Sequence, residues 1–164
     1  SLILMATKLA GAASVTMADV LDAPLKVAES IGADRAVNVR DGDGALADPA
    51  QPRGSFDVAF DASGHPNAVL SAIRHLRPGG TFVQVGTFAD PMVAMPTDQI
   101  MVKELTLKSS FRFDKEFAWA VQYLSEGRID VAPLHSHTFS MEEANDAFRM
   151  ASDRGQSMKV HLAF

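Results

Sequence analysis

Hydrophobic positions alternate between helical and strand-like spacing along almost the whole chain. In residues 1–10 apolar side chains recur every three or four positions, which predicts a helix, and Gly11 follows as glycine does just past a helix end. Residues 13–20 then form a β-type run. Further helices are predicted over 26–31, 67–76, 98–102, 115–126 and from the capping-box pair Ser140 and Glu143 to about 152, and further strands over 34–39, 56–64, 81–87, 105–113 and 158–164.

This alternation indicates an α/β fold, a doubly wound parallel sheet of the Rossmann type with helices on both faces. The sequence opens on the helix–turn–strand part of a βαβ unit, so the sheet is expected to be incomplete at its N-terminal strand. In the strand order 3-2-1-4-5-6 that first strand lies at the centre, between the strands ending at Asp19 and Asp61. Two rows of unpaired backbone groups would face each other there, which predicts that these 164 residues do not fold stably alone.

Composition narrows the class of protein. The chain suits one domain, is 47% hydrophobic and carries a formal net charge of −5 without a cluster of Lys and Arg, which argues against a nucleic-acid partner. No apolar run approaches the roughly 18 residues of a membrane span, so no membrane partner is expected. The absence of cysteine excludes disulfides and thiolate metal sites within these residues and fits a cytoplasmic enzyme.

Asp19 closes the second strand of the pattern. An acid at this position of a dinucleotide-binding unit hydrogen-bonds the adenosine ribose, and its charge repels a 2′-phosphate, which favours NAD over NADP. A carboxylate after a strand can equally cap the following turn. On this feature alone the two interpretations stay open.

Two small-residue turns follow predicted buried strands. Residues 61–66 (DASGHP) and 85–87 (VGT) would both lie at the carboxyl edge of the sheet, where ligands bind in open α/β folds. Small residues there let a ligand approach the backbone. Each turn can also be a tight connection without a ligand, and the residues alone do not decide.

Arg112 and the histidines are the remaining candidates for chemistry. Arg112 stands between Phe111 and Phe113 at a strand end, where a guanidinium can bind an anion, polyol hydroxyls or a neighbouring carboxylate in a structural ion pair. His135 and His137 make at most an incomplete metal site, and the other histidines occur singly. No metal site is predicted from these residues.

The ordered segments resemble the medium-chain dehydrogenase/reductase family of zinc alcohol and polyol dehydrogenases. The resemblance covers essentially the whole chain. It rests on KLAGAASVTMADV, VAESIGADRAVNV, FDVAFDASGHPNAV, LRPGGTFVQVGT, KELTLKSSFRFDKEF, HTFSMEEANDAF and KVHLAF, which follow in the family's order and spacing.

The resemblance implies roles for particular residues in binding NAD. Pro24 departs from the family, since many relatives carry Arg or Lys there over the adenosine. The implied contacts are Asp19 to the adenosine ribose; Ala62, Ser63 and His65 on the adenine side; Val85, Gly86 and Thr87 at the nicotinamide end through backbone groups; Phe111 and Arg112 beside nicotinamide and substrate; and Lys159 against the pyrophosphate.

The resemblance also implies the activity and the organisation. Residues 1–112 would form the dinucleotide-binding domain, without its first strand and GxGxxG turn, and residues 113–164 a C-terminal return segment packing toward a catalytic domain absent from this sequence. That domain would hold the zinc ligands, and no catalytic residue other than a possible substrate contact from Arg112 is expected here. Zinc would polarise the C5 alkoxide of a sugar acid or polyol, and hydride would pass to NAD. A homodimer is expected through the strand Leu105–Ser110.

Three alternatives remain at this stage. FDVAFD followed by a helix and LRPGG also resembles S-adenosylmethionine-dependent methyltransferases, although those folds usually finish with an antiparallel hairpin. A zinc-free quinone or enoyl reductase of the same superfamily would use NADP, against which Asp19 argues. A catalytically silent nucleotide-binding module is the third.

Overall fold

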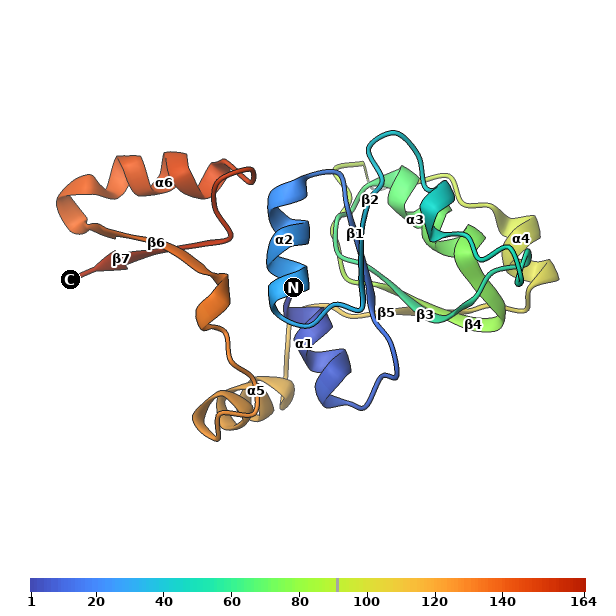
Figure 1. Ribbon diagram of the computed structural model, residues 1–164, viewed down its shortest axis with the longest axis horizontal. Coiled ribbons are helices and arrows are strands. Elements are labelled where there is room, and N and C mark those ends of the chain that lie inside the picture. Colours follow the sequence, from blue (N-terminus) through green and yellow to red (C-terminus); the bar gives the residue numbers. More distant parts are fainter. Residues whose placement is uncertain (91) are drawn as a thin grey trace. The chain divides into compact units, whose positions relative to one another are not determined.

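The computed structural model describes residues 1–90 and 92–164, which form two compact units (Figure 1). One unit comprises Ser1–Gly42 together with Asp114–Phe164, and the other is Asp43–Phe113.

The first unit contains two pairs of parallel strands and their helices. Strand β1 pairs with β2, and β6 pairs with β7, in both cases in parallel. Its elements are α1 (Leu2–Leu9), β1 (Thr16–Asp19), α2 (Asp22–Ser30), β2 (Arg35–Asn38), α5 (Glu116–Ser125), η2 (Ala132–Leu134), β6 (His135–Ser140), η3 (Met141–Glu143), α6 (Ala144–Ser152) and β7 (Lys159–Ala163).

The second unit is a three-stranded parallel sheet in the order β3-β4-β5. Helix α3 packs on it, and the core consists of Val69, Ile73, Leu76 and Phe82, each at most 2% exposed. The unit's elements are η1 (Gly44–Leu46), β3 (Phe56–Asp61), α3 (Pro66–His75), β4 (Leu76–Gln84), α4 (Thr97–Val102) and β5 (Thr106–Ser109).

The α/β class and the parallel sheets predicted from the sequence are confirmed. Among the described residues β1 pairs only with β2, and β3 only with β4, in agreement with a Rossmann-type order that lacks its first strand. Whether these residues fold stably by themselves stays a prediction.

Local predictions fail at three places. The strand predicted over 81–87 begins earlier, because residues 77–80 also belong to β4; Phe56 pairs with Leu76 but Val58 pairs with Thr81, so these four residues bulge from the strand. The helix predicted over 26–31 also begins earlier, with Asp22 in the first turn of α2. Strand β6 was not predicted.

Two surface properties bear on function. Within residues 1–90 and 92–164, no helix combines the length and apolar character needed to cross a membrane.

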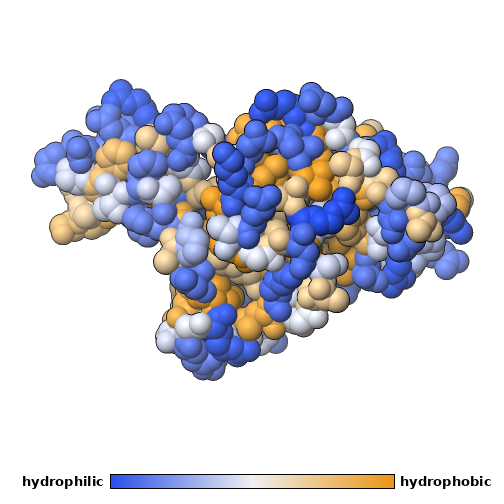
Figure 2. All heavy atoms as spheres, viewed as in Figure 1, coloured by the Kyte–Doolittle hydropathy of each residue, from blue (hydrophilic) through white to orange (hydrophobic). Residues whose placement is uncertain are grey.

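Helix α5 exposes its large apolar side chains, Phe117, Trp119, Val121 and Leu124 among them, and Figure 2 shows hydrophobic residues reaching the surface among polar ones. Exposed apolar groups of this kind often mark a face that another polypeptide covers.

His75, at the end of α3, is buried beside Asp43. Its Nε2 lies 3.2 Å from the Asp43 backbone oxygen and 3.8 Å from Oδ2 of the same residue. Burial lowers the pKa of His75 below its usual 6.5; the Asp43 carboxylate opposes this, and Arg74 and Lys103 add to it.

This lowered pKa predicts a loss of stability in mild acid. The unfolded chain binds a proton to His75 more readily than the folded chain does. The free energy of unfolding is therefore highest above the unfolded pKa of His75, and it falls as pH drops through that value. The urea midpoint of the intact protein should therefore drop between about pH 7.5 and about pH 5.5. His75→Gln should flatten this dependence, whereas the same change at exposed His161 should leave it; equal slopes for all three proteins would contradict the assignment.

Candidate cofactor-binding site

The turns after β3 and β4 meet at one edge of the second unit's sheet. Asp61 and Gln84 are register partners at the ends of these parallel strands. The backbone N–H groups of Val85 and Gly86 both donate to the Asp61 carbonyl oxygen, at 2.8 Å each. The two turns singled out in the sequence are therefore neighbours.

The backbones of these turns approach too closely for a side chain to fit between them. A Cβ on Gly86 would lie 2.9 Å from the Ser63 nitrogen and still closer to the Gly64 nitrogen. A Cβ on Gly64, whose φ is +65°, would lie 2.6 Å from the Thr87 carbonyl carbon. Both glycines are thus required by backbone packing, and Gly64 also by its left-handed conformation.

A buried carboxylate organises the same turns. The Asp61 side chain, in a residue only 3% exposed, accepts hydrogen bonds from Ser63 N (3.0 Å), Ser63 Oγ (2.6 Å), Gly64 N (3.1 Å) and Gln84 Nε2 (2.8 Å). Gln84 Nε2 also donates to the Gly86 carbonyl oxygen at 2.5 Å. Neither Asp61 nor Gln84 was predicted from the sequence as a site residue, although an acid closing a buried strand before a small-residue turn was a usable signal.

Ala62, Ser63 and His65 lie in the turn between β3 and α3 and are exposed. His65 is the N-cap of α3, and its Nδ1 accepts a hydrogen bond from Asn67 N at 3.2 Å. The His65 ring is thereby held at the start of the helix, which fixes where it can meet a ligand.

Phe111 and Arg112 follow β5 after one intervening residue, Ser110. The Ser110 N–H donates to the Gln84 carbonyl oxygen at 2.9 Å, so the chain enters this segment beside the end of β4. Arg112 has a left-handed backbone, with φ of 56°, and its guanidinium carbon lies 5.3 Å from the centroid of the Phe111 ring. Within the described part of the chain no carboxylate lies within 4 Å of the Arg112 guanidinium, so the structural ion pair weighed from the sequence finds no support there.

Asp19 occupies the end of β1 in the first unit. Its Oδ1 accepts a hydrogen bond from Leu21 N at 3.1 Å, so the carboxylate does cap the following turn. Its Oδ2 lies 3.3 Å from Nη2 of Arg154, and Arg40 Nε donates to the Val20 carbonyl oxygen at 3.1 Å. Arg154 therefore lies next to Asp19 and Arg40 next to Val20; neither arginine was predicted from the sequence as a site residue.

Pro24 and Lys159 also belong to the first unit. Pro24 is buried in α2 and supplies no charge, while Lys159 opens β7 and is exposed. The contact between Arg154 and Asp19 could not be predicted from the local sequence, because the two residues are 135 positions apart.

The histidines of β6 and β7 lie close together without forming a metal site. The rings of His135 and His161 have centroids 4.6 Å apart, and His135 Nε2 lies 2.8 Å from Thr138 Oγ1. Among residues 1–90 and 92–164 no group of three or more His, Cys, Asp or Glu side chains is arranged to hold a metal ion. The described residues therefore do not fit a zinc centre of their own.

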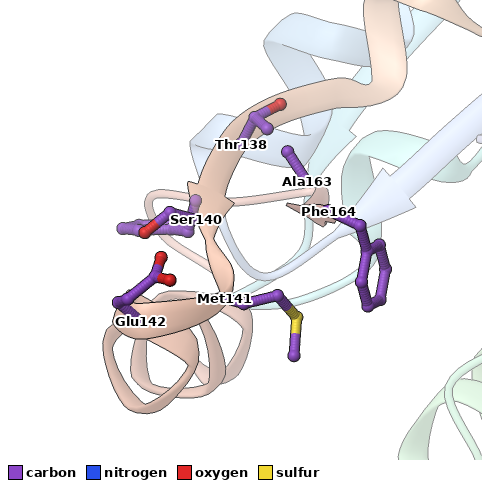
Figure 3. A pocket seen from close by; sticks show the side chains of 7 residues that line it. Thr138, Ser140, Met141, Glu142, Ala163 and Phe164 are labelled. Carbon is purple, nitrogen blue, oxygen red and sulfur yellow. The ribbon is translucent and has the colours of Figure 1, made fainter.

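A hollow beside β6 and β7 is shown in Figure 3. The labelled side chains of Met141 and Phe164 border it, together with Thr138, Ser140, Glu142 and Ala163. None of the residues proposed for the cofactor lines this hollow, so it does not alter the candidate site.

Comparison with known proteins gives consistent matches in sequence and structure. The family described as "Zinc-binding dehydrogenase" matches residues 1–126. L-idonate 5-dehydrogenase (NAD(P)(+)) of Escherichia coli K12 is 37% identical over 163 residues, covering 99% of this chain and 47% of the relative. D-xylulose reductase of Morganella morganii is 35% identical over 148 residues, covering 87% and 43% respectively.

Solved structures agree. The crystal structure of L-idonate 5-dehydrogenase from Escherichia coli K-12 superposes with a TM-score of 0.88 at 38% identity, covering 99% of this chain and 46% of that one. The chain spans about half the length of the curated relatives it matches.

Proposed function

Because the chain belongs to the zinc-binding dehydrogenase family, we propose that it supplies the NAD-binding part of a zinc-dependent dehydrogenase of polyols or sugar acids. The observation that carries this proposal is the pair of turns after β3 and β4, which contact each other backbone to backbone at the carboxyl edge of a parallel sheet. Dinucleotides bind at that edge in open α/β folds, where small residues admit them.

Asp19 is the residue proposed to bind the adenosine ribose. Its carboxylate ends β1, is 14% exposed, and offers the acceptor that ribose hydroxyls need. The charge favours NAD over NADP, and the adjacent Arg154 offsets part of this preference. The E. coli relative is named for both cofactors, and NAD is proposed here as the preferred one.

The remaining contacts are proposed from the resemblance to the dehydrogenase family. Bound NAD supplies the hydride acceptor, and the protein's part is to hold it in place. We assign Ala62, Ser63 and His65 to the adenine side, the backbone of Val85, Gly86 and Thr87 to the nicotinamide end, Phe111 and Arg112 to the border between nicotinamide and substrate, and Lys159 to the pyrophosphate.

L-idonate, oxidised at C5, is the proposed substrate. Its carboxylate suits a cation, and Arg112 is exposed with its guanidinium beside the Phe111 ring. The name of the most extensively matched relative given above supports the same sugar acid.

Zinc and a second subunit complete the proposal. The zinc ligands are proposed to lie outside this sequence, since the described residues do not form a centre. Strand β5 is an edge strand whose four residues are all exposed, which suits pairing with its copy in a homodimer. We also propose that residues 1–112 form the dinucleotide-binding domain, that residues 113–164 form the C-terminal return segment, and that the protein is cytoplasmic.

The arrangement of the last two strands argues against the methyltransferase alternative. Such folds finish with an antiparallel hairpin, whereas β6 and β7 are parallel and joined through α6. No observation favours a silent module over the enzyme.

The test is NAD reduction by the intact protein with L-idonate, with and without added zinc. Arg112→Ala should lower kcat/KM for L-idonate by roughly 10- to 100-fold, the loss expected for a hydrogen bond to a charged group, and should affect a neutral polyol less. Arg149→Ala, which removes an exposed arginine from α6, is the control. Absence of NAD reduction with any sugar acid or polyol would contradict the proposed function, and equal losses for both substrate types would contradict the role of Arg112.

A further inference from the structure

The two turns of the candidate site are joined by one hydrogen-bonded pair of side chains, Asp61 and Gln84. These residues face each other across β3 and β4. Asp61 holds the turn after β3 through Ser63 and Gly64, and Gln84 holds the turn after β4 through the Gly86 carbonyl oxygen. The bond between Gln84 Nε2 and Asp61 Oδ2, at 2.8 Å, connects the two halves.

The chemistry of the pair matches its partners. An ionised carboxylate only accepts hydrogen bonds, and all four groups around Asp61 are donors. The Gln84 amide nitrogen has two hydrogens, and its two partners, Asp61 Oδ2 and Gly86 O, are both acceptors. A hydrogen-bond network around a buried carboxylate, with its donors and acceptors matched in this way, holds its members rigidly.

The two turns contact each other through backbone atoms as well as through the Gln84 side chain. The backbones touch at Gly64 and Gly86, and the N–H groups of Val85 and Gly86 donate to the Asp61 carbonyl oxygen. The side chains of Asp61 and Gln84 add hydrogen bonds that hold the same two turns together. A dinucleotide that contacts the first turn on its adenine side and the second at its nicotinamide end needs both at once.

We propose that Asp61 and Gln84 are positioning residues that hold the nicotinamide-side turn at the distance from the adenine-side turn that the cofactor requires. This inference rests on the proposed function. Neither residue is assigned contact with the reacting atoms: both act through the backbone of Ser63, Gly64 and Gly86.

The test compares two ligands on the intact protein carrying Gln84→Met. Methionine has a similar length but cannot donate, so the Gly86 carbonyl loses its bond while Asp61 keeps its three bonds to the first turn. By calorimetric titration, Kd for NADH should rise about tenfold, the equivalent of one hydrogen bond to a charged group. Kd for ADP-ribose, which has no nicotinamide, should change less than about twofold because the adenine-side turn is retained.

Gln99→Met is the matched control, an exposed glutamine on α4 of the same unit. A purely structural role for Gln84 would lower the folded fraction and weaken both ligands by the same factor. That result, or unchanged affinity for both, would overturn the inference while leaving NAD binding by the unaltered protein intact. If the unaltered protein binds neither ligand, the proposed function fails with it.

A second measurement covers the case in which Gln84→Met does not fold. In the unaltered protein without cofactor, the amide protons of Ser63 and Gly64 should exchange slowly with solvent, since both donate to buried Asp61. Fast exchange that becomes slow only on adding NADH would overturn the inference, because the turns would then be ordered by the cofactor.

Discussion

Replacing Gly86 with alanine should raise Kd for NADH by at least about 100-fold, the largest binding effect expected from a single methyl group in this chain. The new Cβ would lie 2.9 Å from Ser63 N and 3.0 Å from the carbonyl carbon of Ala62, and closer still to Gly64 N. All three atoms belong to backbone, which cannot turn aside as a side chain can. The two turns would have to separate, and the hydrogen bonds that Asp61 makes across them would lengthen or break.

Gly44→Ala is the control for this substitution. Gly44 lies in the same unit, and a Cβ there would meet no atom within 4 Å. Fluorescence titration with NADH, beside a thermal melt of each variant, measures both effects. If Gly86→Ala binds NADH as tightly as the Gly44 variant does, the turns after β3 and β4 do not form the cofactor site.

Lys103→Met should cause the largest loss of stability, about 3 kcal/mol in the free energy of unfolding, because it leaves buried carbonyl groups unpaired. The Lys103 residue is only 9% exposed, and its Nζ donates to the carbonyl oxygens of Ile73 (3.0 Å), Arg74 (2.6 Å) and Leu76 (2.8 Å). These carbonyls stand at the C-terminus of α3, where the helix dipole also favours a positive charge. Burial lowers the pKa of Lys103, and the charge of Arg53 adds to the effect. Keeping the buried ammonium charged therefore costs free energy, which the three hydrogen bonds offset.

Urea unfolding of the intact protein tests this against Lys26→Met, which removes an exposed lysine from α2. The control should stay within about 0.5 kcal/mol of the unaltered protein, as surface substitutions usually do. A similar midpoint for both variants would mean that Lys103 does not stabilise the end of α3.

The periodic parts of the fold could be predicted from the sequence because their signals are local. The capping box is an example: Ser140 and Glu143 exchange the expected hydrogen bonds before α6. The bulge over 77–80 could not be predicted in the same way. Pro78 and its glycines have the composition of a turn, and only pairing with β3 makes the segment part of a strand.

The candidate site could likewise be predicted only where its signal is local. Small-residue turns after buried strands directed attention to residues 61–66 and 85–87, and the structure makes them neighbours. The side chains that hold them, Asp61 and Gln84, act across strands 23 positions apart, and Arg154 reaches Asp19 over 135 positions. Such contacts depend on the packed fold, and a single sequence carries no local signal for them.

We propose that this chain binds a nicotinamide dinucleotide with Asp19 at the adenosine ribose. Equilibrium titration of the intact protein with NADH, alongside Asp19→Ala, tests it most directly. We expect saturable binding that NAD displaces, and a Kd about tenfold higher for the variant, the loss expected for one charge-assisted hydrogen bond. Folded protein that binds no NADH, or that binds S-adenosylmethionine in its place, would contradict the account.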